Sequence, residues 1–355
     1  MKLLVTIDFP PEYGGIQKYL HNITRYSYSS DDLVIVGCSS MPRSTDNSLS
    51  CKVLYVSAFF SSLNKKFSLI PLFTKLALIL REKKGNISIE AGNIYAALVP
   101  FLLSFIKPIE YSVYCYGKEL FPLEKGGFRK ILFRKILNRA EKIHYLSGYT
   151  LSILQKAGIS GSFIHEPPRI KMTADFHRHC KTLSESGINL LTVGRLIPHK
   201  GHTVLISATE MLPENLKWHL TIAGSGPMYK HLKSLIISKN LQNRISIRTG
   251  LTDMQLADLY SSSDIFIFPS LETSDGVEGF GIVLLEAMSY NLPIIATRTG
   301  AIPEVLSEGE CGILVSPDNP GEICDAVVNL FKNASLREKL VRNAALRLEK
   351  HYAWK

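Results

Sequence analysis

The sequence has none of the features that mark a disulfide-stabilised, zinc-binding or membrane-spanning protein. Its six cysteines are scattered and include no C-x-x-C pair, so neither a disulfide framework nor a zinc knuckle is indicated. The longest apolar runs, such as residues 94–106, are too short to cross a bilayer. No charged, apolar and cleavage-site pattern opens the chain. We therefore expect a protein that stays in the cytoplasm.

Patterns typical of nucleic-acid binding are also missing, since the chain shows no helix-turn-helix spacing, zinc finger or aromatic RNP-like motif. Charge, however, is uneven: residues 1–180 hold 24 Lys and Arg against 13 Asp and Glu, and residues 181–355 hold 17 against 18. A basic first half suits an anionic membrane or a phosphorylated acceptor. We expect no nucleic-acid partner, and a steep salt dependence of binding would identify that alternative.

The length of 355 residues exceeds what one core usually supports, so two domains are expected. Apolar β-rich runs alternate with helical patterns in both halves, which predicts two Rossmann-like α/β domains. Proline, charge and weak periodicity mark a linker between them. We place the first domain at residues 1–170, the linker at 171–187 and the second domain at 188–355.

The most informative stretch covers residues 268–303. Glu278 and Glu286 are separated by seven residues, and Gly279-Phe280-Gly281 follows the first of them. Glycines let backbone amides approach a ligand or open a helix, whose N-terminus favours anions. Glu278 then lies in the loop before the helix, and Glu286 lies about one turn into that helix. Two carboxylates so placed can bond different hydroxyls of one polyhydroxylated ligand.

Similar loops follow other predicted strands, and ligands of α/β sheets bind where strands end. The strand at 188–193 leads to Gly194-Arg195 and then to Lys200, and two cations beside a glycine turn can clamp a diphosphate. The remaining loops of this kind hold Gly14 and Gly15, Tyr116 and Gly117, and Gly224 and Gly226.

The run E-G-F-G-I-V-L-L-E-A-M, followed by N-L-P-I-I-A-T, resembles the signature of the retaining, GT-B-fold glycosyltransferases of family 4 (glycosyl transferases group 1). The resemblance implies α/β, Rossmann-like domains facing across a cleft, with the nucleotide sugar on the second and the acceptor on the first. It implies that Glu278 contacts the donor sugar near its reacting carbon and that Glu286 holds the ribose. Arg195 and Lys200 would bind the pyrophosphate and stabilise its developing charge.

The same resemblance assigns further residues to the donor site: Gly14, Gly15, Gly194, Gly224, Gly226, Gly279, Phe280 and Gly281. The chain departs from the family at Tyr116, where members often place a histidine that touches the donor sugar. We expect Tyr116 and Gly117 near the acceptor or sugar, without that histidine's role. Family chains also usually continue beyond a tryptophan like Trp354, so the helix that crosses back to the first domain is expected to be short or missing.

The activity implied is retaining transfer of a hexosyl unit from a UDP- or GDP-linked sugar to a glycan or lipid-linked acceptor. The setting expected is bacterial cell-surface polysaccharide or lipopolysaccharide assembly. No D-x-D triplet is present, so neither a metal nor another cofactor is expected. His165, His177 and His179 lack a nearby acidic or Cys partner and are expected in solvent. The alternatives are a catalytically inactive nucleotide-sugar-binding protein, an epimerase of the same fold, and a phosphorylase, whose pyridoxal lysine context we do not find.

Two basic amphipathic segments complete the first half. Residues 126–142 read GGFRKILFRKILNRAEK. Residues 67–84 form an apolar stretch that ends in a basic cluster. Basic amphipathic helices lie on anionic membranes, although a core helix with a solvated basic face has the same pattern. The basic surplus of this half favours the membrane, so we expect peripheral attachment at the inner face of the cell membrane.

Overall fold

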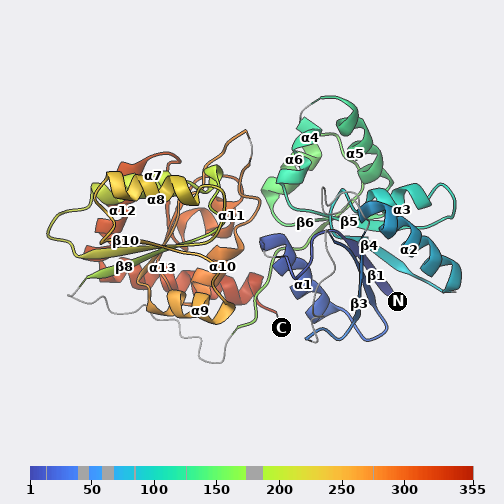
Figure 1. Cartoon of the computed structure of the whole chain (residues 1–355), viewed down its shortest axis with the longest axis horizontal. Helices are drawn as coiled ribbons and strands as arrows, with labels where there is room; N and C mark the ends of the chain where they lie inside the picture. Colours follow the sequence, from blue (N-terminus) through green and yellow to red (C-terminus); the bar gives the residue numbers. More distant parts are fainter. Residues whose placement is uncertain are drawn as a thin grey trace. The chain divides into compact units, whose positions relative to one another are not determined.

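Two parallel β-sheets organise the chain, one in each of two units (Figure 1). Unit 1 is Met1–Pro168 and unit 2 is Arg169–Lys355. The computed structural model describes residues 1–12, 14–38, 48–57, 68–83, 85–124, 126–172, 187–274 and 276–354. Most of the linker predicted at 171–187, with His177 and His179, lies outside these residues. No helix in the described part is long and apolar enough to cross a membrane.

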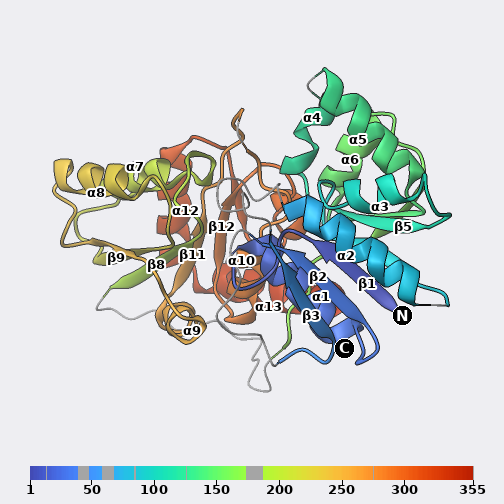
Figure 2. The ribbon, with the colours of Figure 1, turned by 45° about the vertical axis from the view of Figure 1, so that its right-hand side comes forward.

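The sheet of unit 1 has seven parallel strands in the order β3-β2-β1-β4-β5-β6-β7. Figure 2 shows β1, β2 and β3 as neighbouring arrows that run the same way. The strands are short, and β1 and β2 consist mainly of apolar residues, as expected where helices cover both faces of a parallel sheet. Their bounds are Lys2–Thr6, Leu33–Gly37, Lys52–Val56, Ser88–Ala91, Tyr111–Cys115, Lys142–Tyr145 and Ser162–His165 for β1 to β7.

Helices cover both faces of this sheet. One face packs on α2, α3, α5 and α6 through a core that includes Leu72, Phe101, Phe133 and Leu154. The other face packs on α1, whose buried side includes Tyr19 and Leu20. The bounds are Gly15–Ser27, Leu69–Glu82, Leu98–Leu103, Phe121–Glu124, Phe128–Arg139 and Gly148–Lys156 for α1 to α6.

Two elements of unit 1, α3 and β7, depend on contacts beyond their own sequence. Helix α3 begins only at Leu98, because the Asn93 side chain accepts a hydrogen bond from the Ala96 amide at 2.7 Å and closes a turn first. The edge strand β7 is the second of these elements. Its sequence SFIH is too short to show alternation, and it becomes a strand by pairing with β6.

A polar layer fixes α1 on the sheet. Tyr28 and Tyr114 both donate hydrogen bonds to Glu90, at 2.8 and 3.0 Å, and Tyr19 donates to the Glu166 carbonyl at 2.8 Å. Burial and the Glu90 carboxylate raise the pKa values of Tyr28 and Tyr114 well above 10, so both hydroxyls remain donors. Because α1 begins at the Gly14–Gly15 loop, this layer also orients that loop.

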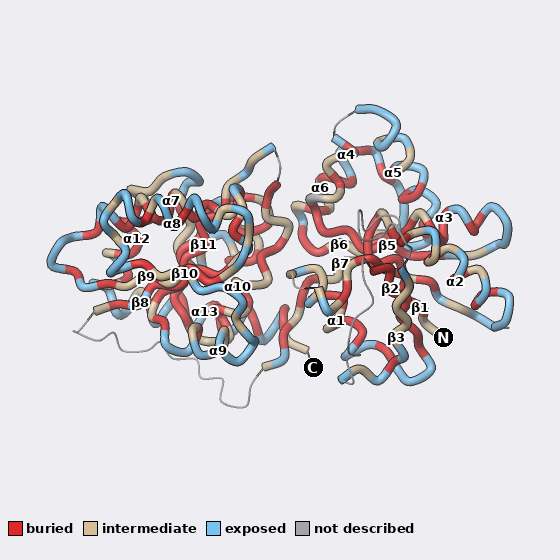
Figure 3. Tube along the Cα trace, in the orientation of Figure 1, coloured by how far each residue is buried: buried red, intermediate tan, exposed pale blue. Residues whose placement is uncertain are grey.

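The sheet of unit 2 has six parallel strands in the order β10-β9-β8-β11-β12-β13. Strands β8, β11 and β12 are almost wholly buried, whereas the edge strands β10 and β13 are only partly buried (Figure 3). The bounds are Ile188–Val193, Trp218–Ala223, Ile245–Arg248, Ile265–Phe268, Ile294–Thr297 and Ile313–Val315 for β8 to β13. The chain turns from one side of β8 to the other between β10 and β11, so β8 and β11 flank the switch point where ligands of such sheets bind.

In unit 2, α7, α8 and α12 lie on one face of the sheet and α9, α10 and α13 on the other (Figure 1). The bounds are His202–Glu210, Tyr229–Ser238, Asp253–Ser262, Ile282–Ser289, Ile302–Val305, Pro320–Lys332 and Ala334–Arg347 for α7 to α13. A π-helix, Leu348–Tyr352, continues α13. Helix α9 has a capping box, in which Thr252 and Gln255 exchange hydrogen bonds with each other's backbone amides.

Candidate functional site

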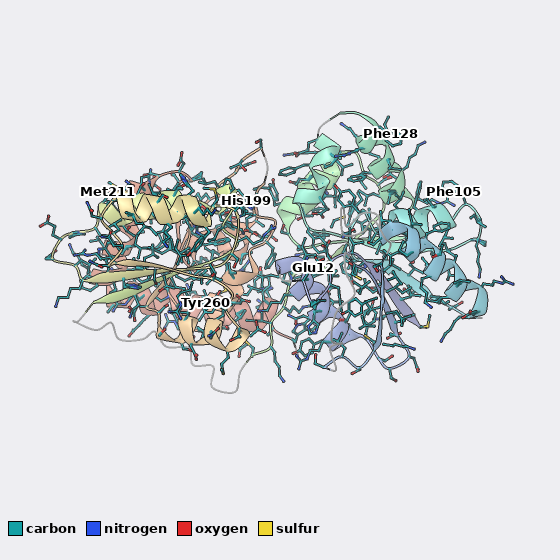
Figure 4. All side chains as sticks on the ribbon, viewed as in Figure 1. Glu12, Phe105, Phe128, His199, Met211 and Tyr260 are labelled. Carbon is teal, nitrogen blue, oxygen red and sulfur yellow. The ribbon has the colours of Figure 1, made fainter. Side chains whose placement is uncertain are left out.

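The loops that follow β8 and β11 meet at the switch point of unit 2. The His199 carbonyl accepts hydrogen bonds from the Leu271 amide at 2.7 Å and from the Ser270 hydroxyl at 3.0 Å. Gly201 has a left-handed φ of 66°, and a Cβ there would lie 1.8 Å from the Pro269 carbonyl oxygen. Only glycine therefore allows the two loops to pack so closely. Figure 4 labels His199 in this part of unit 2.

This packing brings together two of the residues singled out in the sequence. Lys200 comes from the β8 loop and Glu278 from the β11 loop, and the Lys200 ammonium donates to Oε2 of Glu278 in an ion pair. Both side chains are largely buried, with 13% and 14% of their surface exposed. The ammonium also lies 4.8 Å from the centre of the Phe268 ring. Little solvent screens this pair, so its charges interact more strongly than those of a surface pair.

Arg195, the second cation of the proposed clamp, is placed differently. Its side chain is exposed and has no ion pair with any residue that the structure describes. Its carbonyl oxygen lies 3.3 Å from Nε2 of His202, the first residue of α7, and that ring nitrogen donates to it. Only the backbone of Arg195 is therefore fixed, and its guanidinium can turn toward an anion.

His202 supports this loop and was missed in the sequence, where it follows Gly201 without a motif of its own. It is 3% exposed, and Nδ1 has no hydrogen-bond partner among the described residues. Burial lowers the pKa of His202 to about 4, so the imidazole is neutral near pH 7. A neutral ring places no additional positive charge beside Lys200.

The glycines after β9 serve the packing of loops. The Leu196 amide donates to the Ser225 carbonyl at 2.9 Å, and the Met228 amide donates to the Leu196 carbonyl at 3.0 Å. A Cβ at Gly224 would lie 1.8 Å from the Gly194 carbonyl oxygen, and its φ is 154°. Gly194, Gly224 and Gly226 thus hold the loop that carries Arg195, whatever else they contact.

Glu286 lies in α10, one turn after the Gly279–Gly281 loop. Its Oε2 accepts a hydrogen bond from the Tyr260 hydroxyl at 2.9 Å, and the Tyr260 ring stacks on Tyr290 with centres 5.2 Å apart. Burial and the Glu286 carboxylate raise the pKa of Tyr260 well above 10, so the hydroxyl stays protonated. Figure 4 shows Tyr260 inside unit 2. This partner of Glu286 could not be predicted from the sequence, since the two residues are 26 positions apart.

Phe280 does not turn its ring to solvent. It is buried, and its edge meets the Tyr352 ring with centres 5.6 Å apart. The Glu278 carbonyl accepts a hydrogen bond from the Ala301 amide at 3.0 Å. The loop is therefore anchored on both sides of Gly279, and a side-chain contact from Phe280 to a ligand is not supported.

The other predicted residues belong to unit 1. Gly14 and Gly15 open α1. Tyr116 follows β5, but its ring is buried, lies edge-on to Tyr19 at 5.7 Å and donates its hydroxyl to the Gly92 carbonyl at 2.5 Å. The Tyr116 side chain thus packs inside unit 1, and the position of this residue near the acceptor or sugar stays a prediction. Gly117 remains at the strand end beside it.

Polar residues missed in the sequence gather at the same edge of unit 1, where β1 and β4 end. Asp8 accepts hydrogen bonds from Asn93 at 2.5 Å and from Gln17 at 3.2 Å. Glu119 accepts from the amides of Tyr116 and Gly117, and burial raises the pKa of Glu119 to about 7. Their common signal was a polar residue placed just after a buried strand. Across the described residues, no three His, Cys, Asp or Glu side chains are placed to hold a metal ion.

The sequence around these loops is similar to that of a known protein family. The family described as Glycosyl transferases group 1 matches residues 175–347, which include the β8 and β11 loops. An uncharacterized glycosyltransferase of Methanocaldococcus jannaschii is 33% identical over 46% of this chain, but that match spans only 41% of the relative.

Other matches extend over both units. A GDP-mannose-dependent alpha-(1-6)-phosphatidylinositol monomannoside mannosyltransferase of Mycolicibacterium smegmatis is 26% identical over 93% of this chain and 88% of its own length. The crystal structure of Anabaena HepE in complex with UDP and glucose superimposes with a TM-score of 0.77 at 19% identity, covering 99% of this chain and 96% of that one. Its likeness is one of fold.

The buried His202 should make the stability of unit 2 depend on pH. The unfolded residue titrates near 6.5 and the folded one near 4, so between these values the unfolded state binds more protons. Stability should therefore fall as the pH drops through this window. This residue alone should cost about 2 kcal/mol of unfolding free energy between pH 7.5 and pH 5.

Urea unfolding at these two pH values measures the effect. His202→Gln keeps a donor for the Arg195 carbonyl and should lose less stability on acidification than the wild type. His231→Gln, an exposed histidine of α8, serves as the control and should behave like the wild type. Equal acid losses in the wild type and His202→Gln would show that His202 does not carry this dependence.

Proposed function

The chain belongs to the glycosyl transferases group 1 family through its second unit, and we propose that it transfers a hexosyl unit from a UDP- or GDP-linked sugar with retention of anomeric configuration. The observation that carries this proposal is the meeting of Lys200 and Glu278 at the switch point of unit 2. Both belong to motifs that resemble the family's donor site. A cation for the diphosphate and a carboxylate for the sugar are thus adjacent.

In this mechanism each residue has a separate task. As the bond between sugar and diphosphate breaks, negative charge grows on the diphosphate, and Lys200 and Arg195 stabilise it. Glu278 contacts the sugar ring, whose charge and shape change during the reaction. Glu286, oriented by Tyr260, holds the ribose hydroxyls, which do not change. With two cations on the leaving group, we propose that transfer needs no metal ion.

The acceptor side is assigned to unit 1. We propose a glycan or lipid-linked acceptor, used in assembly of a cell-surface polysaccharide or lipopolysaccharide. The mycobacterial relative acts, by its name, on a phosphatidylinositol-linked mannoside, which favours the lipid-linked choice. The surface of unit 1 supports the same choice.

That surface combines exposed apolar and basic side chains on α5. Phe128 and Ile131 are 76% and 57% exposed, and α5 carries five cations and no acid. At its far end Arg139 lies over the Phe105 ring, at 5.0 Å, and donates to the Ser104 hydroxyl at 2.6 Å. Phe105 is itself 67% exposed. Figure 4 shows Phe105 and Phe128 at the periphery of unit 1.

The exposed apolar and basic side chains of α5 suit contact with an anionic bilayer. They extend along the 12 residues of α5, about 18 Å, with aromatic rings near both ends. Aromatic and aliphatic side chains enter the boundary between headgroups and acyl chains, while the cations remain among the phosphates. We therefore propose peripheral attachment through α5 and the end of α3, which would hold unit 1 next to a lipid-linked acceptor.

Stabilisation by sugar nucleotides tests the proposed function. A donor at one hundred times its Kd should add about 2.7 kcal/mol to the unfolding free energy. Thermal shifts against UDP- and GDP-linked sugars should identify the donor, and turnover of that donor should persist in excess EDTA. A shift without turnover would indicate an inactive binding protein, and turnover lost in EDTA and restored by magnesium would contradict the metal-independent mechanism.

The diphosphate clamp predicts losses at two cations. Arg195→Ala and Lys200→Ala should each weaken donor binding and slow turnover by about 1.5 to 3 kcal/mol, the cost of a charge-assisted hydrogen bond. Steady-state kinetics measure both effects. Lys332→Ala, an exposed change at the end of α12, is the control. Wild-type kinetics in both variants would reject the clamp.

The two carboxylates should differ in kinetics. Glu278→Gln should lower kcat at least about tenfold with a modest change in donor KM, because it acts mainly in the transition state. Glu286→Gln should chiefly raise donor KM, because ribose binding is the same in ground and transition states. Gln preserves size in both variants. The reverse pattern would contradict the assignment.

Membrane attachment predicts a charge effect confined to α5. Each Lys or Arg near an anionic surface contributes about 1 kcal/mol, so replacing Arg129, Lys130, Arg134 and Lys135 by Gln should release the protein from acidic vesicles. Vesicle sedimentation measures this, and circular dichroism confirms folding. The matched control replaces four exposed lysines of unit 2: Lys230, Lys233, Lys332 and Lys339. Equal sedimentation of the α5 variant and the wild type would make α5 only a core helix.

A further inference from the structure

Phe280 links the loop that carries Glu278 to the end of the chain. Its buried ring meets the Tyr352 ring edge-on, with centres 5.6 Å apart and planes at 82°. Such edge-to-face pairs add to the stabilisation that burial gives. Only Gly279 separates Phe280 from Glu278, so a shift of this ring must displace the backbone that positions the carboxylate.

Tyr352 is itself held from several sides. It ends the π-helix and is buried. The Arg347 guanidinium lies over its ring at 5.6 Å and donates to its hydroxyl at 3.4 Å. Arg347 also donates to the carbonyls of Val305 and Glu304. Tyr352 therefore has little freedom to move without moving the chain around it.

The backbone of Tyr352 continues this connection to the first residues of unit 2, Arg169–Ile170, here called the junction segment. The Ile170 amide donates to the Tyr352 carbonyl at 2.8 Å, and the Trp354 amide donates to the Ile170 carbonyl at 3.0 Å. The Trp354 indole donates to the Arg169 carbonyl at 3.2 Å, and the Arg169 guanidinium lies 5.2 Å from the ring centre.

We propose that Tyr352 is a positioning residue for the loop that carries Glu278, and that through Tyr352 the loop's occupancy by a sugar nucleotide is transmitted to the junction segment. Each step is a direct contact within unit 2: Glu278 to Phe280 along the chain, Phe280 to Tyr352 through the rings, and Tyr352 to Ile170 through the backbone. Closely packed groups pass displacements on because no void absorbs them. This inference rests on the proposed function, which places the donor at that loop.

Trp354 provides a native reporter of the junction segment. The chain holds two tryptophans, and Trp218→Phe leaves Trp354 as the single fluorophore. In this background, titration with the donor should change the Trp354 emission. Tyr352→Leu removes the aromatic edge and should abolish the change, while donor binding by calorimetry persists and kcat falls about 3- to 10-fold. Tyr352→Phe retains the ring and should retain the emission change.

Phe280→Leu tests the pair from its other side and remains informative if Tyr352→Leu fails to fold. It should also abolish the emission change, and combining it with Tyr352→Leu should lower kcat no further than one change alone. A wild-type emission response and kcat in folded Tyr352→Leu or Phe280→Leu would overturn this inference. In the Trp218→Phe protein, donor binding without a change in Trp354 emission would also overturn this inference, while leaving the proposed function intact. Absence of donor binding in that protein would overturn the proposed function.

Discussion

The ion pair between Lys200 and Glu278 joins the two loops on which the candidate site of unit 2 depends. Removing two charges from water is costly, so a largely buried pair is retained only where each charge has a partner. A diphosphate could replace Glu278 as the counter-ion of Lys200, leaving the carboxylate to the sugar. The contact thus joins the two loops, and under the proposed function it lies where the diphosphate binds.

The backbone makes this pairing possible. Gly201 lets the β8 loop approach the Pro269 carbonyl, and the His199 carbonyl joins it to Ser270 and Leu271. The strand order then determines that these loops, and not others, are neighbours. The Tyr260 hydroxyl donates a hydrogen bond to Glu286, and the Tyr352 ring packs against Phe280 of the glycine-rich loop. The residues that fix the positions of Lys200, Glu278 and Glu286 therefore come from several elements of unit 2.

Much of this could be predicted from local patterns. The family and the GT-B fold are confirmed, and the apolar pattern at 188–193 predicted β8 because strands of a covered parallel sheet are largely apolar. The contacts between distant segments could not be predicted. Lys200 and Glu278 are 78 residues apart, and neither the Tyr260 partner of Glu286 nor the inward turn of Tyr116 leaves a local signal. Each of these contacts depends on how helices and loops that are distant in the sequence pack together.

The central claim is that Lys200 is shared between Glu278 and the diphosphate of the donor. Calorimetric titration of UDP and GDP into the wild type, Lys200→Gln and Glu278→Gln tests it most directly. Lys200→Gln should weaken binding of the preferred nucleotide at least about tenfold, because a charge-assisted bond is lost. Glu278→Gln should bind it as tightly as the wild type or more tightly, because a competing and repelling carboxylate is gone. An equal loss of affinity in both variants would contradict the account.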